Sequence, residues 1–259
     1  MSKPRGLDSQ LQNVVVHNHK GGSGKTTLAV HLSWYLMEYG RNVVLLDLDE
    51  QDNAIRWITQ FEWDGSPAVD VHTDDRGTLA AVSLDADTAV DLANERNAVL
   101  IVDTPPAYDL FDRLPRIVYP ESDDIFVLPV GGRLSLDGAV AVLEEIEARG
   151  LNTRVRIVAN QLDPKKQEAA QSQLRTLEEL EKAFPQLVVF RVAVPSNYKM
   201  HMAERHGERY WERPYADRTY TGKSLRAALG WIASGAYADD AQGTGFDGLD
   251  TDLSERLSI

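Results

Sequence analysis

The 259-residue sequence contains no cysteine, which excludes disulfides, thiolate-bound metals and cysteine-held iron–sulfur clusters. It has no apolar run that approaches the roughly 20 residues needed to span a membrane. Its first five residues, Met1-Ser2-Lys3-Pro4-Arg5, lead into no apolar core of a secretory signal. We therefore expect a cytoplasmic protein that does not enter a membrane.

The chain also lacks an excess of positive charge. Its formal net charge of −13 argues against a protein that coats nucleic acid over its whole surface, although a local basic face is still compatible with it. With 43% hydrophobic residues, a chain of this length can bury the core of one α/β domain, which we expect over residues 13–236 after a polar arm at 1–12. Residues 237–259 carry six acidic side chains and one arginine, and we expect a flexible acidic tail there.

A glycine-rich loop follows the apolar run Val14-Val15-Val16 and precedes Leu28–Tyr39, where apolar residues recur at helical spacing. The loop reads His19-Lys20-Gly21-Gly22-Ser23-Gly24-Lys25-Thr26-Thr27. Such glycines let backbone N–H groups turn toward phosphate oxygens, and the following helix presents the positive end of its dipole. Lys25 is suited to contact the outer phosphates, and the Thr26 hydroxyl to ligate Mg²⁺. The arrangement therefore predicts a site for ATP or GTP with Mg²⁺.

This loop departs from the general pattern G-x-x-x-x-G-K-[ST], because His19 stands where the first glycine is expected and Lys20 follows it. With these residues it resembles the deviant Walker A loop of the ParA/MinD family of ATPases, closest to small ParA-type partition ATPases that lack an N-terminal helix-turn-helix domain. The resemblance implies that Lys20 reaches across a dimer interface to the ATP of the partner subunit. The alternative for Lys20 is a solvated loop charge. The branches of the superfamily that hold iron–sulfur clusters with cysteines are excluded.

Two further strands are predicted to deliver carboxylates to the same edge of the sheet. The apolar run Asn42–Leu48 carries Asp47 and is followed by Asp49, and the run Ala98–Val102 is followed by Asp103. Ligands of open α/β sheets bind beyond the carboxyl ends of the strands, so we expect these acids beside the phosphates. Asp103 stands in the Walker B position, where the acid fixes Mg²⁺.

The segment around Asp49 resembles the family's Asp-x-Asp-Pro-Gln switch segment. The resemblance implies that Asp49 positions the attacking water and touches the Mg²⁺ shell, whereas Asp47 anchors the loop. An exposed acid without a role is the alternative for Asp49. Glu50 stands in place of the family's proline and Asp52 in place of its usual glycine. We expect these added charges to weaken ATP binding or to alter switching.

Strands and helices alternate along the chain. This predicts an α/β fold with a doubly wound, mostly parallel sheet of about seven or eight strands flanked by helices, as in P-loop NTPases. Val69–His72 is expected to be a short edge strand. Asn160 ends a later strand and resembles the asparagine that reads the adenine edge in ParA-like proteins, the alternative being a turn cap. His17 and His19 have no third ligand nearby, so we expect no metal at that pair.

Residues 196–230 carry seven basic against four acidic side chains, in contrast to the acidic chain as a whole. Such a stretch suits sequence-independent contact with a phosphate backbone, and the resemblance implies nonspecific DNA binding that becomes continuous across the ATP dimer. The interleaved acids allow the alternative of ion pairs within helices. The candidates for DNA contact are Arg213, Arg218, Lys223 and Arg226.

Together with these features, the resemblance implies a ParA-like ATPase that closes into an ATP-dependent homodimer, holds nonspecific DNA and is released after hydrolysis stimulated by a partner. The resemblance implies nucleoid association, a ParB-like or other adaptor, and a cargo that is a plasmid, a chromosome or a cellular assembly. A MinD-like membrane-cycling ATPase is one alternative, which the acidic tail disfavours because anionic lipid repels it. A metabolic P-loop synthetase or amidase is the other, which Lys20 disfavours.

Overall fold

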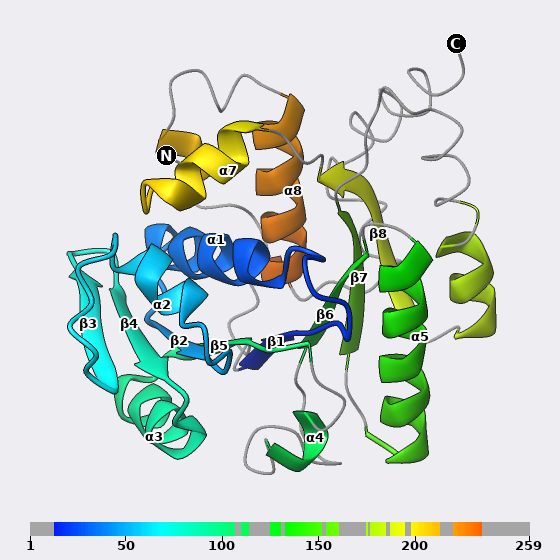
Figure 1. Ribbon diagram of the computed structural model, residues 1–259, viewed down its shortest axis with the longest axis horizontal. Coiled ribbons are helices and arrows are strands. Elements are labelled where there is room, and N and C mark those ends of the chain that lie inside the picture. The colour runs from blue at the N-terminus through cyan, green and yellow to red at the C-terminus, as the bar shows by residue number, and fades with distance from the viewer. Residues whose placement is uncertain are drawn as a thin grey trace.

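The computed structural model describes residues 13–106, 110–113, 125–130, 133–151, 154–160, 175, 177–184, 187–194, 198–212 and 220–234. Within this part of the chain, one eight-stranded sheet carries helices on both faces (Figure 1). The strands are β1 (Asn13–Val16), β2 (Val43–Asp47), β3 (Ala68–Thr73), β4 (Thr78–Ser83), β5 (Val99–Asp103), β6 (Ile125–Val130), β7 (Arg154–Asn160) and β8 (Leu187–Val194). The helices are α1 (Lys25–Glu38), α2 (Asn53–Ile58), α3 (Ala86–Arg96), α4 (Leu110–Arg113), α5 (Arg133–Ala148), α7 (Tyr198–Arg205), the 3-10 helix η1 (Tyr210–Glu212) and α8 (Tyr220–Ser234).

The strand order is β3-β4-β2-β5-β1-β6-β7-β8, and every neighbouring pair is parallel except β3 and β4. This confirms the predicted doubly wound, mostly parallel sheet. β1 lies between β5 and β6. Strands β2 to β5 lie on one side of β1 and β6 to β8 on the other, so the strand order reverses at this point. In such sheets ligands bind at this switch point, beyond the carboxyl ends of the strands. None of the described helices is long and apolar enough to cross a membrane.

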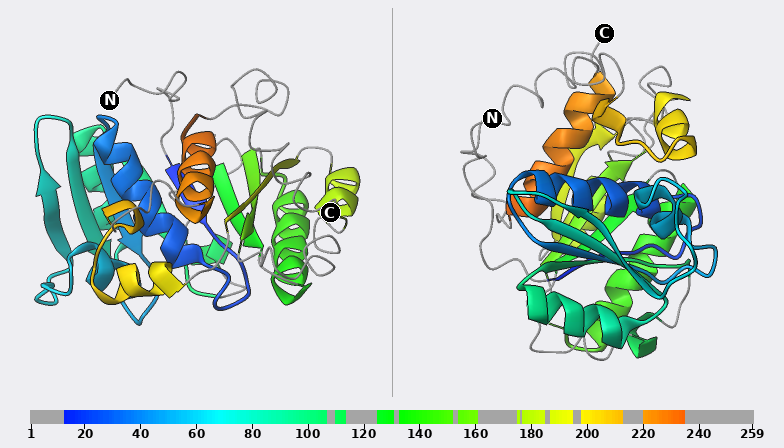
Figure 2. Two further views of the ribbon diagram at one scale, coloured as in Figure 1. Left: turned by 90° about the horizontal axis from the view of Figure 1, so that it is seen from above. Right: turned by 90° about the vertical axis from the view of Figure 1, so that its left-hand side faces the viewer.

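Two apolar layers make up the core, one on each face of the sheet. Because side chains alternate along a strand, Val14 and Val16 of β1 join the layer beneath α1, α2 and α8. Val15 joins the layer that α3 and α5 cover on the opposite face. The right-hand view of Figure 2 shows α1 and α8 on one side of the sheet and α3 on the other. Burial on both faces explains why these strands are continuous apolar runs.

A glycine lies just outside each end of helix α1. Gly24 precedes its first residue with φ 96°, and no side chain caps the N-terminus. At its other end Gly40 has φ 87°, its N–H bonds to the carbonyl of Met37, and the N–H of Arg41 bonds to the carbonyl of Leu36. This pair of bonds is the Schellman arrangement, which needs a residue in the left-handed region. Gly40 therefore closes the helix.

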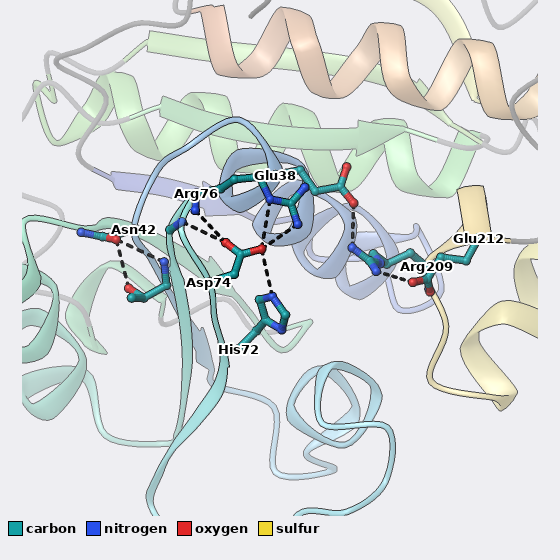
Figure 3. Close-up of polar contacts among 9 residues, drawn as sticks. Glu38, Asn42, His72, Asp74, Arg76, Arg209 and Glu212 are labelled. Atoms are coloured by element: carbon teal, nitrogen blue, oxygen red, sulfur yellow. Dashed lines mark hydrogen bonds and ion pairs between the residues drawn. The ribbon is translucent and has the colours of Figure 1, made fainter. Parts of the chain in front are cut away.

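Strand β3 lies at the edge of the sheet and contains the predicted strand Val69–His72. It runs antiparallel to β4, and its register shifts between Asp70 and His72. Asp70 pairs with Arg96 of α3 at 2.5 Å. The following turn is closed by Asp74, whose carboxylate accepts hydrogen bonds from the backbone and side chain of Arg76 (Figure 3).

Candidate functional site

The loop between β1 and α1 forms the centre of the candidate site. Gly22 and Gly24 adopt φ angles of 73° and 96°, which L side chains rarely adopt. A Cβ on Gly24 would also lie 2.1 Å from Nδ2 of Asn160, so the loop and the end of β7 approach too closely for any side chain. Gly21 is exposed and faces Pro106, whose Cγ would lie 3.9 Å from a Cβ at this position. The predicted strand–loop–helix arrangement is confirmed.

The two lysines of the loop lie in different environments. Lys25 is buried, and its ammonium donates to the carbonyl of Lys20 at 3.4 Å. Burial lowers the pKa of Lys25, and the nearby charges of Asp103 and Asp49 oppose this shift. Lys20 itself is exposed to solvent. One lysine therefore points into the site, and the other is accessible from outside the molecule.

Asp47 and Asp103 lie side by side in the parallel register of β2 and β5. Asp103 is buried, and neither of its carboxylate oxygens has a hydrogen-bond partner of good geometry among the described residues. Burial raises the pKa of Asp103 well above its usual range, and repulsion from Asp47 adds to this, whereas Thr26 and Lys25 act in the opposite direction. A buried carboxylate without donors is suited to a cation.

Asp47 anchors the segment that follows β2, as predicted. Its Oδ1 accepts the N–H of Asp49 at 3.0 Å, and its Oδ2 accepts the N–H groups of Ala54 at 2.8 Å and Ile55 at 3.1 Å. These last two donors belong to the first turn of α2, where a helix has N–H groups without helical partners. Burial raises the pKa of Asp47 to about 6, although the three backbone N–H groups counteract it.

Asp49 lies half-buried in the same segment, and its Oδ1 accepts the N–H of Gln51 at 3.0 Å. The two departures from the family pattern occupy separate surroundings. Glu50 is exposed, whereas Asp52 accepts a hydrogen bond of 2.7 Å from the Ser83 hydroxyl at the end of β4. Asp52 has φ 53°, a left-handed conformation that favours glycine, which is the residue it replaces. The effect of both residues on ATP binding stays a prediction.

The residues at the site fit a magnesium ion. Thr26 lies half-buried in the first turn of α1, close enough to Asp103 to lower the pKa of that acid. Among the described residues, no group of three or more His, Cys, Asp or Glu side chains gathers as a metal cage. Magnesium commonly takes one or two protein ligands together with waters and substrate phosphates, which suits the Thr26 hydroxyl and the buried Asp103 carboxylate.

The side chains of His17 and His19 lie next to each other at the start of the loop. Their rings pack edge to face, with 5.1 Å between the ring centroids.

Sequence reasoning missed Thr104 and Asn18, which hold the start of the loop. The Thr104 hydroxyl donates to the carbonyl of Val16 at 3.0 Å, so its oxygen accepts from Nδ1 of His17 at 2.7 Å. Burial, with repulsion from His19 and Lys25, lowers the pKa of His17 to about 3. The only signal for these residues in the sequence is that polar side chains directly follow buried strands.

Asn160 lies at the loop, as its place at the end of β7 predicts. It is buried, and its Nδ2 donates to the carbonyl of Ser23 at 2.7 Å. Ser23 is buried too, and its hydroxyl has no hydrogen-bond partner among the described residues. Thr27 lies half-buried in the first turn of α1. The reading of a base by Asn160 stays a proposal, and its contact with the loop is a finding of the structure.

The basic stretch is described only in part. Arg213 and Arg218 lie outside the described residues. Lys223 is exposed on α8, and the guanidinium of Arg226 stacks over the ring of Trp211 at 4.6 Å. Figure 3 shows Arg209 between Glu38 and Glu212, with 2.7 Å separating it from Glu38. Arg209 is therefore ion-paired, but its partner Glu38 belongs to α1, so this pair joins two separate elements and is not the pair within one helix that the alternative predicts.

A parallel switch point, a loop with left-handed glycines, a buried lysine and paired aspartates at the strand ends define a P-loop nucleotide-binding protein. The sequence profile of the CobQ/CobB/MinD/ParA nucleotide binding domain matches residues 14–204. The chain belongs to this family, and the predicted ParA/MinD resemblance is confirmed.

The chain is similar in sequence to a chromosome-partitioning ATPase and to a carboxysome distribution protein, and in structure to McdA. The chromosome-partitioning ATPase Soj of Thermus thermophilus is 28% identical over 177 residues, covering 59% of this chain and 69% of Soj. The maintenance of carboxysome distribution protein A of Halothiobacillus neapolitanus is 30% identical over 155 residues, covering 59% of this chain and 67% of the relative. The solved structure of apo McdA from Cyanthece superimposes with a TM-score of 0.64 at 16% identity, covering 85% of this chain and 99% of McdA.

Proposed function

We propose that this chain is a ParA-type ATPase that forms an ATP-dependent sandwich dimer, binds nonspecific DNA and is released by adaptor-stimulated hydrolysis. It would serve the partition of a plasmid or chromosome, or the positioning of another cargo. Membership of the family and the names of the two relatives, a chromosome-partitioning ATPase and a carboxysome distribution protein, support this proposal.

The observation that carries the proposal is the contrast between the two loop lysines. Lys25 is buried and adjoins the aspartates, as a lysine that contacts phosphates in its own subunit should be. Lys20 is exposed on the same loop, five residues earlier. An exposed lysine there has access to a second copy of the chain, and its charge would stabilise the transferring phosphoryl group of the partner's nucleotide.

The remaining residues have separate tasks in this proposal. The loop N–H groups from Gly21 to Thr27 would surround the phosphates, and Asn160 would contact the adenine edge. Thr26 and Asp103 would hold Mg²⁺, which neutralises charge between phosphate oxygens when it is bound. Asp49, near the Mg²⁺ shell, would orient the attacking water. In this proposal water attacks the phosphorus and no side chain does, so the chain would act by positioning and by charge.

Nucleotide-dependent DNA retention tests the proposal. The full chain is mixed with a long random-sequence duplex at low salt in the presence of Mg²⁺ with ATP or ADP. We expect retention of the duplex with ATP only, because a continuous basic face needs two subunits. Equal retention in both states, or none in either, contradicts the DNA-binding part of the proposal.

The variant Lys20→Ala tests the dimer. We expect it to bind ADP as the wild type does, but to lose ATP-dependent dimerisation, measured by light scattering, and most of its turnover. The exposed Lys182→Ala is the matched control, because it removes the same side chain away from the loop. A Lys20→Ala variant with unchanged turnover contradicts the proposed role in the partner's site.

A further inference from the structure

The side chain of Asn18 makes hydrogen bonds to three backbone groups around the start of the loop. Asn18 is fully buried between β1 and the loop. Its Nδ2 donates to the carbonyl of Pro129 in β6 at 3.0 Å and to that of Ser135 in the first turn of α5 at 2.8 Å. Its Oδ1 accepts the backbone N–H of Lys20 at 2.8 Å. One side chain thus joins the loop, a neighbouring strand and a helix.

An asparagine is chemically matched to this place. Its amide group has two N–H donors and a carbonyl acceptor, and all three functions are used here. Aspartate keeps the acceptor for Lys20 but has no donor for the two carbonyls, and alanine has neither. Because the site is buried, groups left without a partner would not be satisfied by solvent.

Helix α5 approaches the same point through Gly138. A Cβ on Gly138 would lie 2.6 Å from Oδ1 of Asn18 and 3.3 Å from the backbone nitrogen of Lys20. The first of these distances is shorter than real Cβ atoms accept, so any side chain at 138 would push Asn18 away from Lys20. Gly138 and Asn18 are therefore one structural unit, which we call the Asn18 clamp.

The backbone of Lys20 is held on both sides. The clamp binds its N–H, and the ammonium of Lys25 lies 3.4 Å from its carbonyl oxygen. The Lys20 side chain is exposed, so the backbone at Lys20 fixes the point from which it reaches out. A small displacement of the Lys20 backbone also displaces the ammonium at the end of the side chain. A misplacement of about 1 Å can cost roughly 10²-fold in rate.

We propose that Asn18, seated against Gly138, is a positioning residue that fixes the backbone of Lys20 so that its side chain is presented to the nucleotide of a partner subunit. This inference rests on the proposed function, since it gives Lys20 that task. It adds to the reaction a residue whose three side-chain hydrogen bonds go to backbone groups of the chain itself. Because Asn18 also binds β6 and α5, it links the orientation of Lys20 to those two elements.

Asn18→Ala in the full chain is the first test. We expect kcat for ATP hydrolysis to fall by about tenfold or more while the affinity for ADP changes by less than about twofold, because the displaced Lys20 serves the nucleotide of the partner subunit and not that of its own. The matched control is Asn42→Ala, which also removes three hydrogen bonds away from the loop. Nδ2 of Asn42 donates to the carbonyl of Arg96. Its Oδ1, whose two contacts are drawn in Figure 3, accepts from the backbone N–H and the hydroxyl of Thr78. If kcat falls equally in both variants, the clamp has no special role and the proposal is overturned.

Double variants separate positioning from loss of packing. In a Lys20→Ala background, Asn18→Ala should lower turnover no further, because the residue it positions is gone. Gly138→Ala should behave like Asn18→Ala by itself, yet add little to it in combination, since the new methyl group then occupies the vacated space. Additive losses in either pair overturn the proposal.

Amide exchange tests the clamp even if the proposed function fails. Should the wild type neither hydrolyse ATP nor dimerise, the proposed function is wrong, but the hydrogen bond from Lys20 to Asn18 can still be measured. We expect the Lys20 amide, followed by NMR, to exchange at least about tenfold faster in Asn18→Ala than in the wild type or Asn42→Ala. An unchanged exchange rate removes the structural basis of the inference.

Discussion

The imidazole of His31 accepts the backbone N–H of Tyr210 through Nε2 at 3.0 Å. Its Nδ1 lies 2.7 Å from the carbonyl of Thr27, so Nδ1 carries the proton and donates it to that carbonyl. The ring packs edge to face against Trp57 of α2 and Trp211 of η1. Through this one neutral histidine, the segment before α8 is attached to the helix that begins at the glycine loop.

The pH dependence of stability should report on His31. Burial lowers the pKa of His31 from 6.5 to about 4. Between these pH values the unfolded chain binds a proton that the folded chain does not, so stability falls on acidification by up to about 1.4 kcal/mol per pH unit from this group. In urea unfolding, the stability difference between the wild type and His31→Gln should therefore narrow from pH 7 to pH 4.5.

Comparing the two proteins removes the opposite contribution of the carboxyl groups. Asp47, whose pKa is raised to about 6, binds a proton in the folded state first and favours folding as the pH falls. Both proteins share this effect. The exposed His206→Gln serves as a control for the replacement of a histidine outside this contact. A constant difference between wild type and His31→Gln would mean that His31 titrates normally.

Gly24→Ala should damage the loop more than its backbone conformation alone explains. Gly24 and Gly65 have similar φ angles, 96° and 91°, but a Cβ on Gly65 meets nothing within 4 Å. Gly65→Ala should cost about 1–2 kcal/mol from the left-handed conformation, and Gly24→Ala should cost more because of the clash with Asn160. ADP affinity, measured by calorimetry, should fall in Gly24→Ala only. Equal effects in the two variants would argue against the clash.

Asp52→Gly should leave stability nearly unchanged. Glycine relieves a left-handed conformation that costs about 1–2 kcal/mol in other residues, and it loses the hydrogen bond from Ser83, worth about 1 kcal/mol. Asp52→Ala keeps the strain and loses the bond, so it should destabilise the chain by about 1 kcal/mol. Urea unfolding distinguishes them. If Asp52→Gly is the less stable of the two, the strain at φ 53° is not significant.

Lys223→Ala should weaken DNA retention without affecting the fold. Lys223 is exposed, so its loss should lower the slope of log K for DNA binding against log salt concentration by about one. The free energy of unfolding should stay within about 0.5 kcal/mol of the wild-type value. Arg226→Ala should also destabilise the chain, because its guanidinium stacks on Trp211. Retention of a duplex is measured against salt, with thermal unfolding in parallel. If Lys223→Ala binds DNA as the wild type does, DNA contact lies elsewhere.

The motifs and the fold were predictable from the sequence because each motif is short and directly follows a buried strand. The glycine loop after Val16 and the acids at 47, 49 and 103 needed only the rule that parallel strands end at one edge. The anchoring task of Asp47 was predicted and is confirmed by its contacts with Asp49 and the first turn of α2.

The supporting contacts were not predictable because they join distant parts of the chain. Asn18 binds carbonyl groups 111 and 117 residues away, and His31 binds an N–H group 179 residues away. The sequence around Asn18 or His31 contains no motif or spacing that distinguishes it from the surroundings of an ordinary buried polar residue. The partners of Asn18 become evident only from the strand order, which places β6 beside β1. The partner of His31 becomes evident only from the packing of the 3-10 helix against α1.

The edge strand β3 restricts how two copies of this chain can associate. A free sheet edge invites another strand to pair with it, but β3 carries an irregular register and the charged Asp70 in its middle. Both features oppose the addition of a strand from a second molecule. At this end of the sheet, fusion into a continuous intermolecular sheet is therefore disfavoured.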